Sequence, residues 1–185
     1  MMDTDLKHLM IRSTTVVGIV RDGKAAMAAD GQVTLGETVL KRSARKIRRL
    51  YSDTVLVGFS GTGADAFALV ERLEEKLETA RGNLPRAAVD LAREWRTDKY
   101  LRELQALIAA VDREHALLIG GSGEIVESED GIVSVGSGQP YAIAAARALD
   151  AHTRMGPARI ALESIRIASG ICIYTGGDIQ LEELD

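Results

Sequence analysis

Strand-like and helix-like patterns come in blocks along this chain, and their order restricts the folds that it can adopt. Apolar, β-branched runs bounded by glycine or polar turns predict strands, whereas apolar residues that recur every three or four positions predict helices. The blocks are strands, two helices, strands again, two more helices and a final strand. The predicted strands cover residues 14–20, 24–29, 53–59, 107–111, 115–119, 123–126, 132–135 and 172–175. The predicted helices run from the glycine-rich turn 60–63 to residue 82, from 85 towards 104, from 141 to 151 and from 158 to 168.

This order of elements predicts an α+β fold. Antiparallel sheets covered by segregated helices produce such blocks, and two stacked sheets between helix layers satisfy the pattern. A chain of 185 residues is long enough to bury a core of this kind as one domain, without disulfides or a structural metal.

The composition restricts the function classes. A net charge of −4 and a pI near 5.5 argue against a nucleic-acid binder, although residues 41–49 are strongly basic and need their own explanation. Cys172 is the single cysteine and is expected to be a buried thiol. No segment resembles a signal peptide or approaches the length of a membrane span, so we expect a cytoplasmic protein that binds no membrane.

Two glycine patterns come close to phosphate-binding motifs. Residues 18–25 have the glycine and lysine spacing of a P-loop but lack the hydroxyl residue that would bind Mg²⁺, and a hairpin is the better interpretation. Gly61, Gly63 and Ala66 match the G-x-G-x-x-A dinucleotide form between a predicted strand and a predicted helix. Against that alternative, the next predicted element is a helix where a parallel strand is required, and no strand-end acid follows about twenty residues on.

A hydrolase that depends on histidine or zinc is poorly supported. No serine stands in a G-x-S-x-G elbow, and His8, His115 and His152 lie in the leader, near a predicted turn and near a helix end. Histidine and cysteine are also too few and too scattered for a zinc site. Another group must then act as the base, and the free α-amine of an N-terminal threonine has a suitable pKa of about 8.

Thr14 begins the first predicted strand and is the candidate for such a threonine. Asp30 ends the strand predicted to pair with it, so the hairpin can return this carboxylate to the first residues of the strand. Lys46 comes from the basic run. An ammonium beside the threonine would favour an ionised hydroxyl and keep the neighbouring amine neutral, while Asp30 would hold that lysine charged and oriented.

Several segments together resemble the HslV family, the proteasome-like peptidases of bacterial HslUV ATP-dependent proteases. The resemblance extends from Thr14 nearly to the C-terminus. The segments that carry it are Thr14-Thr15-Val16-Val17, residues 29–36 (ADGQVTLG), residues 45–51 (RKIRRLY), Ala64-Asp65-Ala66-Phe67, Gly136-Ser137-Gly138 with Pro140-Tyr141-Ala142, and residues 171–175 (ICIYT).

The resemblance implies the N-terminal nucleophile hydrolase fold, a four-layer αββα sandwich, and a threonine endopeptidase activity. It implies that residues 1–13 are a leader removed by self-cleavage and that residues 14–185 form the single peptidase domain. Thr14 is then the nucleophile, with Asp30 and Lys46 as charged partners. Ser137 supplies a hydroxyl that orients protons near the amine, and the N–H of Gly61 faces the oxyanion.

The resemblance also implies a bound cation and an assembly. Carbonyls at Ser169, Cys172 and Thr175 would hold a cation, with Na⁺ as the expected ion, because hard cations prefer oxygen ligands. Two stacked hexameric rings would enclose the active sites, and the AAA+ unfoldase HslU would bind the ATP and deliver unfolded proteins. Two other functions stay open at this point: a catalytically silent, ring-forming scaffold of the same fold, and the dinucleotide-binding domain considered above.

Overall fold

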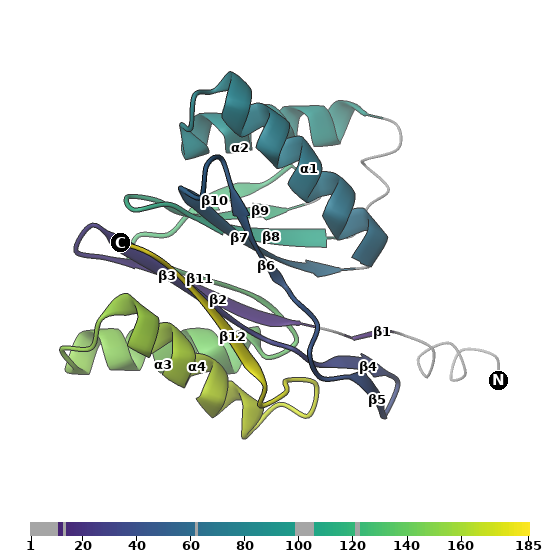
Figure 1. The fold of residues 1–185 in the computed structure, drawn as a ribbon, viewed down its shortest axis with the longest axis vertical. Helices are drawn as coiled ribbons and strands as arrows, with labels where there is room; N and C mark the ends of the chain where they lie inside the picture. The colour runs from purple at the N-terminus through teal and green to yellow at the C-terminus, as the bar shows by residue number, and fades with distance from the viewer. Residues whose placement is uncertain (1–10, 13, 62, 99–105, 121–122) are drawn as a thin grey trace.

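The computed structural model describes residues 11–12, 14–61, 63–98, 106–120 and 123–185. Two antiparallel sheets are stacked face to face, and a pair of helices covers the outer face of each (Figure 1). The five-stranded sheet has the order β10 (Ile125–Glu127), β9 (Ala116–Gly120), β8 (Ala106–Val111), β7 (Val55–Gly61) and β6 (Ile47–Leu50). The four-stranded sheet has the order β11 (Ile132–Gly136), β2 (Thr15–Arg21), β3 (Lys24–Asp30) and β12 (Ile179–Leu184). The four-layer αββα sandwich predicted from the sequence is confirmed.

The helices form one pair on each side of the stacked sheets. The helices α1 (Gly63–Thr79) and α2 (Leu84–Thr97) cover the five-stranded sheet, and α3 (Gln139–His152) and α4 (Pro157–Ser169) cover the four-stranded sheet. The start of α2 is fixed by Asn83, whose side chain accepts a hydrogen bond from the N–H of Arg86, and by Pro85 in the first turn. No helix in the described part of the chain has the length and apolar character that crossing a membrane requires.

Three apolar cores separate the four layers. Each sheet shares one core with its own helices, and the third core lies between the sheets. The central strand β2 is therefore buried on both faces: Val16 packs between the sheets, whereas Val17 packs under the helices α3 and α4. This double burial explains why residues 15–19 read as a nearly continuous apolar run instead of an alternating one.

The hairpin predicted at the start of the chain is confirmed. Strands β2 and β3 pair antiparallel, with Val16 opposite Ala29, and Asp22 and Gly23 form the turn between them. Both turn residues have positive φ, 54° and 72°, as a two-residue hairpin turn requires. Since Val16 lies opposite Ala29, the register brings the residues before Val16 next to Asp30.

The prediction of a strand at residues 172–175 is wrong. Those residues form a turn after α4, in which the N–H of Thr175 bonds to the carbonyl of Cys172 at 3.0 Å. The closing strand is instead β12, in the acidic tail, and it pairs with β3 so that Ile179 lies opposite Asp30. A short apolar run in the sequence can be either a strand or a turn with buried side chains, because both require apolar residues.

Strands were missed in the polar stretch after Asp30. This stretch forms β4 (Val33–Leu35), β5 (Thr38–Lys41) and β6, and β4 pairs both with β5 and with the short strand β1 (Ile11–Arg12). All four residues of β5 are exposed, so hydrophobic alternation gives no signal there. The second helix was predicted to continue towards Leu104, but α2 ends at Thr97, and residues 99–105 lie outside the described part of the chain.

Candidate active site

Thr14 lies directly before β2 and is buried with 3% of its surface exposed. Its carbonyl accepts the main-chain N–H of Ser137 at 2.8 Å. The next residue, Thr15, donates its N–H to Asp30 Oδ1 at 2.7 Å. The structure therefore places the predicted nucleophile between two of its predicted partners, while Ser13 and the bond to be cleaved lie outside the described residues.

Asp30 ends β3, and its side chain is completely buried. Besides the N–H of Thr15, Oδ1 accepts Lys46 Nζ at 2.9 Å, and Oδ2 accepts the N–H groups of Gln32 at 2.9 Å and Gly176 at 3.0 Å. A buried carboxylate is tolerated only when it is paired and hydrogen-bonded. These four donors satisfy both oxygens and hold the carboxylate in one orientation.

Lys46 directly precedes β6 and is buried with 4% of its surface exposed. Its Nζ donates to Asp30 Oδ1 and, at 2.7 Å, to the main-chain carbonyl of Gln32. An ammonium has three N–H donors, so these two contacts leave one for a further acceptor. Burial lowers the pKa of Lys46 below its usual value, and the charge and hydrogen bond of Asp30 oppose that shift.

Ser137 lies in the turn between β11 and α3, as expected from the sequence. Its side chain is exposed, and its main-chain N–H holds the carbonyl of Thr14. The residue before it, Gly136, has a φ of 102°, and a Cβ there would overlap the carbonyl oxygen of Thr14. A glycine is therefore required both by the backbone conformation and by the close approach of Thr14.

Gly61 ends β7, at the same end of the five-stranded sheet as Lys46. Ile47 pairs with Gly58 in the antiparallel β6–β7 ladder, so the chain before Ile47 and the chain after Gly58 leave the ladder on the same side. Gly61 has a φ of 135°, a conformation that few other residues adopt. Its position suits an N–H donor near the site, and the oxyanion role stays a prediction.

Thr15 and Thr175 form a contact that the sequence did not reveal. Their hydroxyl oxygens are 2.7 Å apart, and the hydroxyl of Thr15 also accepts the N–H of Gly138 at 2.9 Å. Both threonines are buried, so these hydroxyl bonds replace water. The turn after α4 is thereby tied to the residue that follows the predicted nucleophile.

The three predicted cation ligands lie close together in sequence at the end of α4. Ser169 is the last residue of that helix, and the buried Cys172 and Thr175 lie in the turn that follows. Carbonyls at a helix C-terminus lack intrahelical partners and lie at the negative end of the helix dipole. The carbonyl of Ser169 fits this description, whereas the carbonyl of Cys172 accepts the N–H of Thr175 at 3.0 Å, and the cation site stays a prediction.

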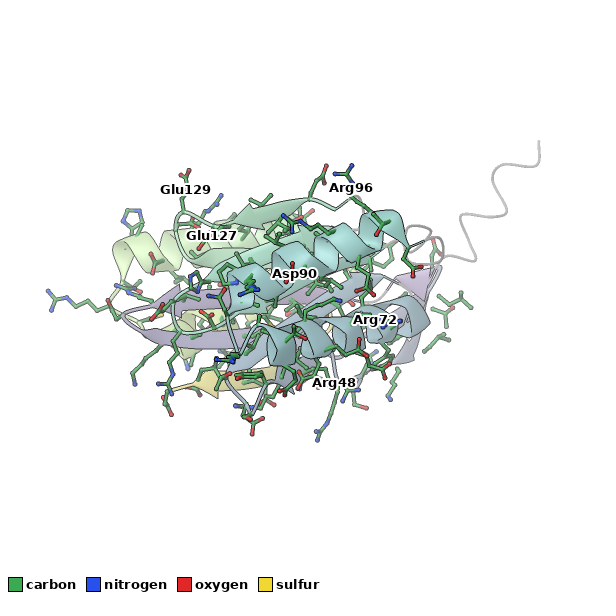
Figure 2. All side chains as sticks on the ribbon, turned by 90° about the horizontal axis from the view of Figure 1, so that it is seen from above. Arg48, Arg72, Asp90, Arg96, Glu127 and Glu129 are labelled. Carbon is green, nitrogen blue, oxygen red and sulfur yellow. The ribbon has the colours of Figure 1, made fainter. Side chains whose placement is uncertain are left out.

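The basic run 41–49 does not form a continuous phosphate-binding surface. Lys46 turns inward to Asp30, Arg49 pairs with Glu182 at 2.8 Å, and the guanidinium of Arg48 lies over the ring of Phe67 at 5.2 Å. Figure 2 shows Arg48 low in the view and Glu129 at the upper margin of the molecule. Within this run, Lys46 therefore belongs to the candidate site, and Arg49 stabilises the edge of the sheet through its ion pair.

The structure does not favour either phosphate-binding alternative. Residues 18–25 form the β2–β3 hairpin. The strand before Gly61 pairs antiparallel with both its neighbours, β6 and β8, and α1 leads directly to α2. A dinucleotide fold requires parallel strands on either side of the glycine-rich turn.

An αββα sandwich of antiparallel sheets, with a threonine at the start of its central strand beside a buried lysine–aspartate pair, defines the threonine class of N-terminal nucleophile hydrolases. A model of the family described as "Proteasome subunit" matches residues 10–184. The chain therefore belongs to the proteasome subunit family, in its HslV branch.

The branch rests on similar proteins and on solved structures. The "ATP-dependent protease subunit HslV" of Chlorobium luteolum is 57% identical over 178 residues, which cover 96% of this chain and 98% of that protein. The HslV subunit of Syntrophobacter fumaroxidans is 54% identical over 95% of this chain and 98% of its own length. The crystal structure of eukaryotic HslV from Trypanosoma brucei has a TM-score of 0.86 and 42% identity, covering 92% of this chain and 99% of that one. Thiobacillus denitrificans BPH, with a TM-score of 0.71 and 18% identity over 92% of this chain and 97% of its own, shares the fold.

Proposed function

We propose that this chain is the proteolytic subunit of an ATP-dependent protease, and that Thr14 is its nucleophile after self-cleavage of the Ser13–Thr14 bond. The observation that carries the residue assignment is the single oxygen, Asp30 Oδ1, that binds both the N–H of Thr15 and the ammonium of Lys46. This oxygen joins a buried carboxylate, a buried ammonium and the threonine backbone in one hydrogen-bonded unit.

The proposed reaction is acyl transfer to the hydroxyl of Thr14. The α-amine that self-cleavage exposes takes the hydroxyl proton as the oxygen attacks a peptide carbonyl, and then gives that proton to the leaving amine. Lys46 lowers the amine's affinity for protons through its positive charge, and Asp30 holds Lys46 in place. The N–H of Gly61 faces the oxyanion, the hydroxyl of Ser137 orients protons beside the amine, and water finally hydrolyses the acyl ester.

A cation belongs to this proposal as a structural component. The carbonyls of Ser169, Cys172 and Thr175 would hold it, and Na⁺ is the ion we expect. A bound cation would neutralise carbonyl dipoles at the end of α4 and stiffen the turn that contacts Thr15. Replacing Na⁺ by choline at constant ionic strength should then lower the melting temperature, and an unchanged melting temperature would contradict the cation site.

The relatives are named as subunits of an ATP-dependent protease, which supports a partner that uses ATP. We propose two stacked hexameric rings that enclose the sites in the cytoplasm, with the AAA+ unfoldase HslU binding ATP and feeding in unfolded proteins. Enclosure suits a peptidase that degrades proteins, because only unfolded chains could then reach its sites. Co-sedimentation with HslU in the presence and absence of ATP tests the partnership.

Intact-mass measurement tests the central assignment. Purified wild-type protein should have the mass of a chain that begins at Thr14 and should hydrolyse a fluorogenic peptide, whereas Thr14→Ala should keep its leader and be inactive. Thr14→Ser, which keeps a hydroxyl and an amine, should retain processing and part of the activity. Full peptidase activity in an unprocessed wild-type chain would overturn the proposal. Unprocessed protein that assembles and cleaves nothing would favour the silent scaffold.

A further inference from the structure

The turn formed by residues 171–176 is bound to the active site through two main-chain groups and one side-chain hydroxyl. The side chain of Ile173 is 76% exposed, whereas its carbonyl points inward and accepts Gln32 Nε2 at 2.9 Å. The N–H of Gly176 donates to Asp30 Oδ2, and the hydroxyl of Thr175 meets that of Thr15. Three separate contacts thus join this turn to the residues around the nucleophile.

Gln32 lies at the centre of these contacts and is buried with 4% of its surface exposed. Its main-chain N–H binds Asp30 Oδ2 and its main-chain carbonyl accepts Lys46 Nζ at 2.7 Å. Its side-chain amide donates to two acceptors, the carbonyl of Ile173 and, at 3.1 Å, the hydroxyl of Thr34. One residue therefore contacts both members of the buried ion pair and the 171–176 turn.

The side chain of Gln32 restricts how its own backbone can move. Its side-chain amide donates one hydrogen bond to Thr34 in β4 and one to Ile173 in the 171–176 turn. A Cβ at Gly176 would come within 2.8 Å of Gln32 Cβ, so the turn also packs tightly against this side chain. Because these contacts hold the side chain of Gln32, they also fix the orientation of its main-chain carbonyl, which accepts the ammonium of Lys46.

We propose that Gln32 is a positioning residue of the peptidase: its side chain, held by Thr34 and Ile173, fixes the carbonyl that orients the ammonium of Lys46. The inference rests on the proposed function of Thr14 and Lys46 and extends it to a residue outside the nucleophile, acid and lysine. The proposal also links the 171–176 turn to the reaction. Displacing Ile173 would release the side chain of Gln32, whose carbonyl keeps Lys46 in place.

Gln32→Met tests the proposal, because methionine keeps the length of the side chain, adds no charge and removes both donors. Gln180→Met is the matched control: Gln180 Oε1 accepts the main-chain N–H of the same lysine at 3.1 Å and does not contact its ammonium. In the mature protein we expect Gln32→Met to lower kcat on a fluorogenic peptide about 10- to 100-fold and to change KM less than about 2-fold. Gln180→Met should keep kcat within about 3-fold of wild type.

A second measurement does not require activity. In Thr14→Ala protein, an NMR titration that follows ¹³Cε of Lys46 should give a lower pKa when Gln32→Met is added, because the ammonium loses a fixed acceptor. The Gln180→Met change should leave that titration unmoved. If wild-type protein cleaves no peptide, the proposed function fails, and the Lys46 titration still decides whether Gln32 holds the ammonium. An unchanged titration, an unchanged kcat, or equal losses in the two variants would overturn the positioning role.

Discussion

Asp30 binds the backbone of Thr15 at 2.7 Å through the same oxygen that receives the ammonium of Lys46 at 2.9 Å. The antiparallel register of β2 and β3 produces the first contact, because pairing Val16 with Ala29 brings their neighbours together. The second contact requires a lysine from a segment beyond the hairpin. One carboxylate thus fixes the strand of the proposed nucleophile relative to the lysine, and the following predictions test this arrangement.

Asp30→Asn should cause a large loss of stability and activity. Asparagine has the same shape, but it cannot offer four acceptor positions to Thr15, Lys46, Gln32 and Gly176, and it leaves a buried ammonium without its counter-charge. Breaking a buried pair in this way costs about 3–5 kcal/mol. Urea unfolding measures this loss, and kcat/KM should fall at least about 100-fold.

The matched control for this change is Asp130→Asn. Asp130 pairs with Arg147 at 2.6 Å on the surface, where such pairs contribute about 1 kcal/mol or less. Equal stability losses in the two variants would show that the buried pair has no special role.

Lys46→Met combined with Asp30→Asn should be less harmful than the sum of the two single changes. Each single variant leaves one buried partner uncompensated, whereas the double variant leaves two neutral side chains. We expect a coupling free energy of about 1–3 kcal/mol in a double-mutant cycle measured by urea unfolding. Additive effects within about 0.5 kcal/mol would contradict direct pairing. All three variants should have greatly reduced peptidase activity, because Asp30→Asn removes the carboxylate that holds Lys46 and the other two variants lack the ammonium.

The lowered pKa of Lys46 makes stability depend on pH in the alkaline range. Between its lowered pKa in the folded protein and its usual value of 10.5, the unfolded chain binds a proton that the folded chain has released. Rising pH therefore favours the folded state across that window. The free energy of unfolding of the wild type should rise relative to that of Lys46→Met as the alkaline pH approaches 10.5. A difference that falls or stays constant over this range would show that burial does not lower this pKa.

Gly136→Ala should damage the site more than its backbone strain explains. A methyl group at this position would overlap the carbonyl of Thr14, in addition to the strain of a φ of 102°. Gly23→Ala is the matched control, since Gly23 has a φ of 72° and nothing within 4 Å of an added Cβ. We expect Gly23→Ala to lose about 1 kcal/mol of stability with unchanged kcat, and Gly136→Ala to lose both stability and at least about 10-fold in kcat. Equal kcat values in the two variants would contradict the close approach of Gly136 to Thr14.

Much of the fold could be predicted because the strongest patterns are local. The hairpin at Asp22-Gly23, the two helix pairs and the central strands carry turn chemistry or periodicity that burial enforces. The strands β4, β5 and β6 could not be predicted, because β4 has only three residues, β5 is exposed throughout, and β6 has two exposed arginines between its buried ends, so that pairing with neighbours defines them. The error at residues 172–175 has the same origin, since pairing with β3 selects β12 and leaves the apolar segment as a turn.

The amino-acid sequence identifies the residues that could do chemistry: a threonine at the start of a β-branched strand, an acid at the end of its partner strand, and a lysine in a basic run. Which of these residues meet depends on the folded chain. Of the basic run, Lys46 lies just before β6 and is buried against Asp30, whereas Arg48 lies within β6 and is exposed, and the path of the backbone into β6 separates these two similar side chains. The roles of Gln32, Thr175 and Gly176 depend on contacts that span about 140 residues or more, and no local pattern records which main-chain groups a folded chain brings together.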